Sequence, residues 1–555
     1  MPGGRSQTLT PFLWRASRLY PDTDIISRTH TGVERYDYGT YAERTAQLAH
    51  ALDDAGYGDG ERLATVCWNH HRHFETYFGV PGVGAQLHTI NPLLPDGHLQ
   101  YIVESTSDRA IFVDHSLIET LEGAVADDPD AFQTVERYVV MGEEIPETDL
   151  EPVVAYEAFV DGYPTSYDWP HLDGDRPAGM CYTSGTTGKP KGVAYTQRML
   201  WSHTMGMQSP QGIPMADDDV VMPVVPMFHV NAWGLPYAAT AGGAAHVFPG
   251  PQPSPEDVAG LIESEGVTIA AGVPTVWIGL MEYAEETAVD LSELETLVVG
   301  GSAAPESMIR FFDDRGVSVL HAWGMTETTP IGSAAHVRAD LQDAGYETRL
   351  DKRVKQGLIL PGLEFRVVDA DGEEVAWNGE DFGELQLRGP WVTTEYFGRP
   401  EADDAEFDDG YLKTGDVVTV DADGYIEIVD RRKDVIKSGG EWISSVELEN
   451  EIMAHESVRE AAVIGAPHER WQERPLALAV PTEGRGEDRG GDALAEAIRE
   501  HVRDAYPEWW VPDNVVTIEA IPKTATGKFD KQALREEYSD ESLVDGRVPE
   551  DAAPE

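Results

Sequence analysis

Residues 182–192 read YTSGTTGKPKG, a stretch that combines glycines, hydroxyl side chains and two lysines. Backbone N–H groups of such a loop can converge on phosphate oxygens, and its hydroxyls can add donors or contact a metal ion. The order differs from the P-loop pattern GxxxxGK[ST], because a match starting at Gly185 would need its second glycine where Pro190 stands. The stretch therefore predicts a phosphate-binding loop of another kind.

Lysine is scarce in this chain, and none occurs before Lys189. Lys191, Lys433, Lys437 and Lys528 all lie in glycine-rich or otherwise patterned stretches. Because acidic side chains dominate the composition, we expect a lysine in such a place to be needed there.

Three strand-like runs end in turns of small or hydroxyl residues. They are PAGMCY before the loop at Thr183, TLVVGG before SAAP (302–305), and GVSVLHAWG before MTETTP (325–330). Ligands in open α/β sheets bind outside the carboxyl ends of strands. We therefore expect these turns to contribute to one ligand crevice.

The loop at 182–192 resembles the phosphate loop of the acyl-adenylate-forming superfamily, which includes acyl-CoA synthetases, firefly luciferases and the adenylation domains of peptide synthetases. Its companions follow in the family's order: HAWGMTET (321–328), YLKTGD (411–416), DRRKD (430–434), IKSGGEW (436–442) and PKTATGK (522–528). The stretch VPMFHVNAWGLPY (225–237) is most similar to medium- and long-chain fatty acyl-CoA synthetases. The resemblance implies an ATP-dependent fatty acid–CoA ligase that forms acyl-AMP and pyrophosphate, and then acyl-CoA and AMP.

The same resemblance implies which residues contact the nucleotide and the metal ion. It implies that Trp323 supports adenine, that Asp416 accepts the ribose hydroxyls, and that Glu327 and Thr183 hold Mg²⁺. Indole offers a flat face for stacking a base, so tryptophan suits a position where many relatives have tyrosine. The full set of implied ATP contacts is Thr183, Ser184, Gly185, Thr186, Thr187, Gly188, Lys191, Val230, Gly301, Ser302, Ala303, His321, Ala322, Trp323, Gly324, Thr326, Asp416, Arg431, Lys433, Lys437 and Trp442.

The resemblance also implies which residues act in catalysis and which contact the fatty acid and CoA. Lys528 would lie between the carboxylate and the α-phosphate, where a cation stabilises charge that builds up at phosphorus. Thr326, Glu327 and His229 are the other implied catalytic residues, with His229 near the reacting carboxylate and Trp233 as a gate over the acyl tunnel. The implied path of the CoA pantetheine arm passes Ser438, Gly439 and Gly440.

A histidine cluster, NHHRH (69–73), raises the possibility of a metal site. It has no accompanying cysteine and no ordered ligand spacing. We therefore predict surface or helix-end histidines at these positions.

With 555 residues, the chain exceeds the roughly 250 to 300 residues over which one core grows. Alternating strand-like and helix-like segments predict an α/β fold with largely parallel sheets. We expect an N-terminal adenylate-forming domain at 1–430, a hinge at 431–434 around Lys433, a small mobile α+β domain at 435–540, and an acidic tail at 541–555.

The charge balance excludes two classes of partner. There are 41 basic and 99 acidic side chains, for a net charge of −58, which repels nucleic acid and anionic membranes. Because the acids are spread through the chain, they indicate a haloarchaeal-type adaptation to a high-salt cytoplasm. The 2 cysteines provide no disulfide framework. No apolar run reaches about 20 residues, and the N-terminus lacks a signal-peptide core, so we expect a soluble cytoplasmic protein.

Several alternatives stay open. The motifs do not determine acyl length, so an acyl-CoA synthetase for short-chain or aromatic acids is a second possibility. Luciferase-like oxidation and a free-standing adenylation protein begin with the same adenylate. From another class, the chain could be a catalytically silent nucleotide or acyl-AMP sensor. A homodimer is implied by the resemblance to long-chain relatives.

Overall fold

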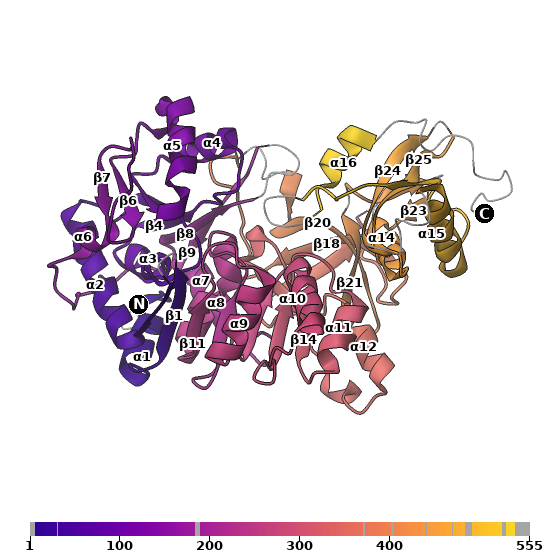
Figure 1. The fold of residues 1–555 in the computed structure, drawn as a ribbon, viewed down its shortest axis with the longest axis horizontal. Helices are drawn as coiled ribbons and strands as arrows, with labels where there is room; N and C mark the ends of the chain where they lie inside the picture. The colour runs from indigo at the N-terminus through magenta and orange to yellow at the C-terminus, as the bar shows by residue number, and fades with distance from the viewer. Residues whose placement is uncertain are drawn as a thin grey trace. The chain divides into compact units, whose positions relative to one another are not determined.

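The computed structural model describes residues 6–29, 32–183, 189–369, 372–400, 405–431, 433–438, 441–468, 470–482, 491–523 and 529–538. These residues form two compact units (Figure 1). The first unit contains 6–183, 189–365 and 387–412, and the second contains 366–386 and 413–538. The predicted hinge at 431–434 is not tested by this division and stays a prediction.

One sheet of the first unit has seven strands in the order β7-β6-β5-β3-β4-β8-β9. Its strands are parallel except for the β8–β9 pair. Runs such as LATV and AIFV are buried along their whole length, as parallel strands require. The bounds are β3 (Arg62–Val66), β4 (Gln86–Thr89), β5 (Ala110–Asp114), β6 (Arg137–Met141), β7 (Val153–Ala155), β8 (Pro177–Tyr182) and β9 (Gly192–Thr196).

A second sheet of the same unit has nine strands in the order β16-β15-β14-β13-β12-β10-β11-β1-β2. The pairs from β1 through β11, β10, β12 and β13 to β14 are parallel, and both edges are antiparallel. The bounds are β1 (Asp24–Thr29), β2 (Gly32–Asp37), β10 (Val220–Pro223), β11 (Ala245–Phe248), β12 (Ile269–Gly272), β13 (Thr296–Val299), β14 (Ser318–Gly324), β15 (Ile331–Ala334) and β16 (Leu358–Ile359).

Helices cover these sheets, and α8 to α11 follow one another along the nine-stranded sheet in Figure 1. Helix α9 shows how local sequence sets the bounds. Ser254 and Asp257 form a reciprocal capping box at its start, and Gly266 ends it with φ 62°. The helices of this unit are α1 (Thr10–Leu19), α2 (Tyr38–Asp54), α3 (His71–Gly82), α4 (Asp96–Thr106), α5 (Ile118–Asp127), α6 (Tyr156–Val160), α7 (Gln197–Met207), α8 (Leu235–Gly242), α9 (Pro255–Glu265), α10 (Pro274–Glu286), α11 (Glu306–Asp313) and α12 (Tyr346–Val354).

Shorter strands follow. One sheet has the order β17-β18-β20-β19, with β21 paired to β20. Another, in the second unit, has the order β23-β22-β25-β24, with β26 paired to β25. The bounds are β17 (Glu364–Val368), β18 (Phe382–Arg388), β19 (Phe407–Asp408), β20 (Tyr411–Val420), β21 (Ile426–Arg431), β22 (Ile436–Ser438), β23 (Glu441–Ile443), β24 (Val458–His468), β25 (Gln472–Pro481) and β26 (Asn514–Thr517), with helices α14 (Ser445–Ala454), α15 (Gly491–Ala505) and α16 (Lys531–Tyr538).

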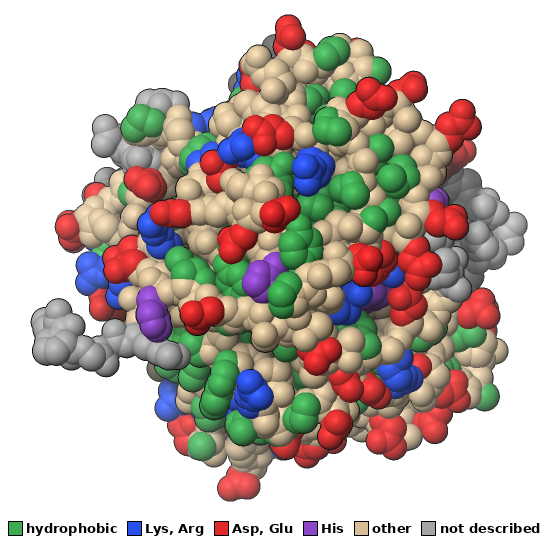
Figure 2. Space-filling view, turned by 90° about the vertical axis from the view of Figure 1, so that its left-hand side faces the viewer, with side chains coloured by type: hydrophobic (Ala, Val, Ile, Leu, Met, Phe, Trp, Pro, Cys, Tyr) green, Lys and Arg blue, Asp and Glu red, His purple; other side chains and the backbone are tan. Residues whose placement is uncertain are grey.

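The expected α/β class, with a large N-terminal part and a smaller C-terminal part, is confirmed. Figure 2 shows the acidic side chains scattered over one face of the molecule, with fewer basic ones among them. Within the described ranges, each helix is too short or too polar to cross a bilayer.

Three histidines in the core of the first unit make its stability depend on pH. Burial lowers the pKa of His73, His203 and His246 to about 3 in each case. In the unfolded chain a histidine takes up a proton near pH 6.5. Since the unfolded state binds more protons below that pH, the stability present at pH 7 is lost as pH falls.

We expect His246→Phe to reduce this loss. The wild-type free energy of unfolding should fall between pH 7 and 5.5, and the variant should lose about 1 kcal/mol less over that interval. Urea unfolding at the two pH values measures the difference. An equal loss in both proteins would contradict a neutral, buried His246.

Candidate active site

The base of the predicted phosphate loop is closed by hydrogen bonds. Strands β8 and β9 pair up to Tyr182 and Gly192. Beyond them, the Thr183 N–H donates to the Lys191 carbonyl at 2.9 Å, and the Lys191 N–H donates to Thr183 Oγ1 at 3.1 Å. The two ends of the predicted loop are thereby held together. The remaining predicted contacts, Ser184, Gly185, Thr186, Thr187 and Gly188, lie outside the described residues.

Tyr396 contacts both the predicted phosphate loop and the carboxylate predicted to bind the metal ion. Lys191 Nζ lies 4.6 Å from the centre of the Tyr396 ring and forms an ion pair with Glu406. The Tyr396 hydroxyl donates to Glu327 Oε1 at 2.7 Å. Tyr396 and Glu406 were not predicted from the sequence, where nothing marks them out in TTEYFGRPEADDAEF (393–407).

The turn after β14 holds Thr326 and Glu327 in a buried position, with 7% and 6% of their surface exposed. The Tyr195 hydroxyl of β9 donates to the Thr326 carbonyl at 2.8 Å. The turn also requires glycine at 324, because a Cβ there would lie 1.9 Å from the Pro330 carbonyl oxygen. These contacts place the end of β14 beside the β8–β9 hairpin, although the strands belong to different sheets.

The donor chemistry fits Mg²⁺. Glu327 provides a carboxylate and Thr183 a hydroxyl, and Mg²⁺ usually takes one or two protein carboxylates, water and substrate phosphates. Among the described residues, three or more histidine, cysteine or acidic side chains do not gather in a way that would form a protein-only metal cage. Such a site would depend on nucleotide phosphates for the rest of its ligands.

The predicted ATP contacts 301–303 and 321–324 lie at the ends of adjacent strands β13 and β14. Trp323 is buried and packs on Gly332, where a Cβ would lie 2.6 Å from its ring. His321 and Ala322 are buried in β14, and burial lowers the pKa of His321. In the turn after β13, Gly301 (φ 83°) and Ser302 are exposed and Ala303 is half-buried, which leaves backbone open to a ligand.

The predicted acyl segment has an unusual backbone. Val230, Asn231, Ala232 and Trp233 have φ of 45°, 55°, 48° and 55°, and Gly234 continues the run. This left-handed conformation costs an L-residue about 1–2 kcal/mol, so it persists only where the surroundings hold it. The Trp233 ring packs on Gly300, where a Cβ would lie 3.1 Å from it. The predicted gate thus contacts the loop that carries the predicted ATP contacts Gly301, Ser302 and Ala303. His229, directly before the run, is half-buried.

Other predicted residues lie in the second unit. Asp416 is fully buried, and the Arg431 Nε lies 2.6 Å from its Oδ1, so these two predicted ribose or phosphate contacts are neighbours. Lys433 and Lys437 are exposed, and Trp442 pairs with Lys437 in the β22–β23 ladder. The Ser438 hydroxyl is buried and accepts from Arg474 at 3.1 Å. Gly439, Gly440 and Lys528 lie outside the described residues.

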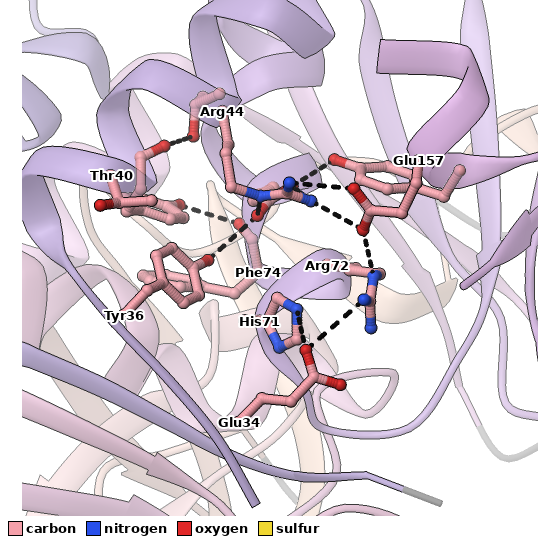
Figure 3. Close-up of polar contacts among 12 residues, drawn as sticks. Glu34, Tyr36, Thr40, Arg44, His71, Arg72, Phe74 and Glu157 are labelled. Carbon is pink, nitrogen blue, oxygen red and sulfur yellow. Dashed lines mark hydrogen bonds and ion pairs between the residues drawn. The ribbon is translucent and has the colours of Figure 1, made fainter. Parts of the chain in front are cut away.

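The prediction of surface histidines at 69–73 was wrong, while their helix-end position was correct. His70 caps α3, and all twelve residues of α3 are buried. They can be buried because a charge network surrounds them (Figure 3). Arg44 contacts Glu75 at 2.6 Å and Glu157 at 3.0 Å, and Glu157 also contacts Arg72 at 2.6 Å.

Two family models match the chain: AMP-binding enzyme over residues 13–397, and AMP-binding enzyme C-terminal domain over residues 447–528. A long-chain-fatty-acid–CoA ligase of Thermus thermophilus is 44% identical over 96% of this chain and 95% of its own length. A 3-methylmercaptopropionyl-CoA ligase of Ruegeria pomeroyi is also 44% identical, over 95% and 96%. A medium-chain-fatty-acid–CoA ligase of Ectopseudomonas oleovorans is 39% identical over 95% of each.

Among solved structures, an anthranilate CoA ligase, AuaEII, in complex with anthranoyl-AMP has the same fold. Its TM-score is 0.85 at 23% identity, and the match covers 96% of this chain and 98% of that one.

Tyr396→Phe tests the contact with Glu327, because it removes the hydroxyl and keeps the ring beside Lys191. We expect Mg-ATP to bind about tenfold more weakly, since a hydrogen bond to a charged group contributes on the order of 1.5 kcal/mol. Calorimetric titration measures the affinity. Tyr38→Phe is the matched control, because its buried hydroxyl donates to the Ala244 carbonyl at 2.8 Å. Equal affinities in the two variants would contradict this role for Tyr396.

Proposed function

Because the chain belongs to the AMP-binding enzyme family, we propose that it is an AMP-forming acyl-CoA ligase for medium- and long-chain fatty acids. The carboxylate attacks the α-phosphorus of ATP to give acyl-AMP and pyrophosphate; the CoA thiol then attacks the acyl carbon, and AMP leaves. The observation that supports this most is the 44% identity, over 96% of the chain, to a long-chain ligase.

For the first half-reaction, we propose that residues around β8, β9 and β14 hold the departing phosphates. Lys191 exchanges its partner Glu406 for phosphate oxygens while it stays on the Tyr396 ring. The Tyr396 hydroxyl orients the Glu327 carboxylate. Mg²⁺ held by Glu327 and Thr183 would neutralise pyrophosphate. Thr326 would add a phosphate contact, and Lys528 would stabilise charge between the carboxylate and the α-phosphate.

For the acyl group, we propose that His229 lies near the carboxylate and that Trp233 gates the alkyl chain. Packing of Trp233 on Gly300 supports a link between the acyl and nucleotide sides. Asp416 would accept the ribose hydroxyls, with Arg431 beside it.

We propose four parts: an N-terminal domain at 1–430, a hinge at 431–434, a C-terminal domain at 435–540 and a tail at 541–555. For the second half-reaction, the C-terminal domain would turn about the hinge. The turn would withdraw Lys528 and bring Ser438, Gly439 and Gly440 towards CoA. Two chemistries on one adenylate need two arrangements of the same chain, which a short hinge supplies.

A second candidate is an acid with a heteroatom in its chain, such as 3-methylmercaptopropionate. The 44% identity to a ligase named for that acid favours it. In the same direction, Asn231 Nδ2 and the Tyr237 hydroxyl are buried in the acyl segment without a hydrogen-bond partner among the described residues. A buried donor left unpaired by a plain alkyl chain is unfavourable.

We also propose that the enzyme works in a high-salt cytoplasm and forms a homodimer. The net charge of −58 and the 2 cysteines support the first part. The dimer rests on the resemblance to long-chain relatives, and sedimentation in high salt would test it.

The substrate class is tested by CoA-dependent AMP formation in high salt with acids from acetate to long chains, 3-methylmercaptopropionate, benzoate and cinnamate. We expect a maximum at six or more carbons. Lys528→Ala should reduce the rate of acid-dependent pyrophosphate release at least about a hundredfold, because it removes a charge that acts in the transition state. The variant should still convert supplied acyl-adenylate and CoA to thioester.

Other outcomes of that panel would change the proposal. Maximal activity with acetate or with aromatic acids would show that the substrates are short-chain or aromatic acids instead. Pyrophosphate release without thioester formation would indicate a ligase that does not use CoA. Absence of acid-dependent pyrophosphate release with every acid would favour a nucleotide sensor.

Unfolding in graded KCl tests the high-salt proposal. We expect the melting temperature to rise with KCl well beyond physiological ionic strength, because screening weakens repulsion among the acidic side chains. A melting temperature that stays constant or falls with KCl would reject it.

A further inference from the structure

Asn69, which precedes helix α3, contacts the segment that leads into the acyl turn. Its Nδ2 donates to the carbonyls of Pro223 at 2.8 Å and Val225 at 3.0 Å. Its Oδ1 accepts from the Met227 N–H at 2.6 Å. The side chain is 3% exposed, so one buried carboxamide makes three hydrogen bonds to a backbone more than 150 residues away.

Neighbouring side chains complete these contacts. The Tyr77 hydroxyl, from α3, donates to the Met227 carbonyl at 2.6 Å. Thr89 Oγ1, from β4, donates to the Phe228 carbonyl at 3.4 Å. β10 ends at Pro223, and the Val224 and Val225 N–H groups still donate to the Ala271 carbonyl of β12, at 2.8 and 3.0 Å. The other buried polar groups of this backbone need partners from outside the sheet. Asn69 and Tyr77 provide them.

The residues that follow are the strained ones. Val230 begins the left-handed run two residues after Phe228. The run includes Trp233, which packs on Gly300, and it ends at Gly234. A run of this kind keeps its conformation only where the surrounding structure holds it. On the C-terminal side, α8 starts directly with Leu235 and Pro236. On the N-terminal side, the fixed part is the segment 223–228.

We propose that Asn69, with Tyr77, is a positioning residue that sets acid specificity by fixing residues 223–228 and hence the turn that carries Trp233. Asn69 acts through the backbone and needs no contact with the acid. The inference rests on the proposed function. If the contacts are lost, the turn relaxes towards right-handed conformations, Trp233 leaves Gly300, and selection by chain length weakens.

Asn69→Leu, Asn69→Asp and Tyr77→Phe test this. Leucine keeps the side-chain volume and removes all three hydrogen bonds. Aspartate keeps the oxygen that accepts from the Met227 N–H, but it places a second carboxylate oxygen against the carbonyls of Pro223 and Val225 in place of the donor. We expect the acid KM to rise about tenfold in both Asn69 variants and about threefold in Tyr77→Phe, with the ATP KM changed by less than about twofold. The range of acids that the enzyme accepts should widen more in the two Asn69 variants than in Tyr77→Phe.

Two control variants separate positioning from general stability. Gln100→Leu removes a buried carboxamide that donates to the Ala124 carbonyl at 3.0 Å, and Tyr38→Phe removes a hydroxyl that donates to the Ala244 carbonyl at 2.8 Å. Both should lower the melting temperature as much as the test variants, yet leave the ratio of acid KM to ATP KM and the acid profile unchanged. Because Tyr77→Phe is mild, it keeps the test valid if the Asn69 variants do not fold.

The outcomes distinguish this inference from the proposed function. If the wild-type protein forms AMP and the test variants keep its profile and its KM ratio, the inference is overturned while the function stands. If the wild type prefers acids of another class, the same ratios are measured with those acids. If the wild type activates no acid, the proposed function fails first, before any variant is compared.

Discussion

The charge network around Glu75 holds helix α3 in place, and the helix region in turn holds the segment that leads into the acyl turn. Glu75 has no exposed side-chain surface, and it accepts from Arg44, Tyr36 and Tyr156. Arg44 continues to Glu157, which Figure 3 shows between Arg44 and Arg72. Breaking a buried pair by removing one partner typically costs about 3–5 kcal/mol. The network therefore gives α3 one strongly preferred position among α2, α6 and β2.

From that position, the α3 region fixes the backbone before the acyl turn. Asn69 and Tyr77 lie at the start and middle of the helix region and hold the segment before the acyl turn. The charged cluster around Glu75 and the strained backbone turn that starts at Val230 are thus linked through α3 and Asn69. Packed interiors transmit such constraints because they have few voids into which they can relax.

A second constraint comes from the net charge of −58, which repels anionic substrates such as ATP and CoA. Salt shortens the range of that repulsion to about 3 Å at 1 M. Near the site, Lys191 is paired with Glu406 and rests on Tyr396, so its charge is held in place without a phosphate. Under the proposed function, Lys191 would exchange this anionic partner for phosphate oxygens.

The sequence by itself determined the class of fold and the strands at 177–182, 296–299 and 318–324, because these depend on residues close together in the chain. The tertiary structure alone decided which distant side chains support them: Tyr396 lies 69 residues from Glu327, and Asn69 lies 158 from Met227. It also reversed the expected exposure of His70, His71 and His73. Composition predicts charged and imidazole groups at the surface, whereas pairing with carboxylates from β2 and α6 allows α3 to be buried on every side. Pairings of this kind arise from packing between segments, and no local spacing encodes them.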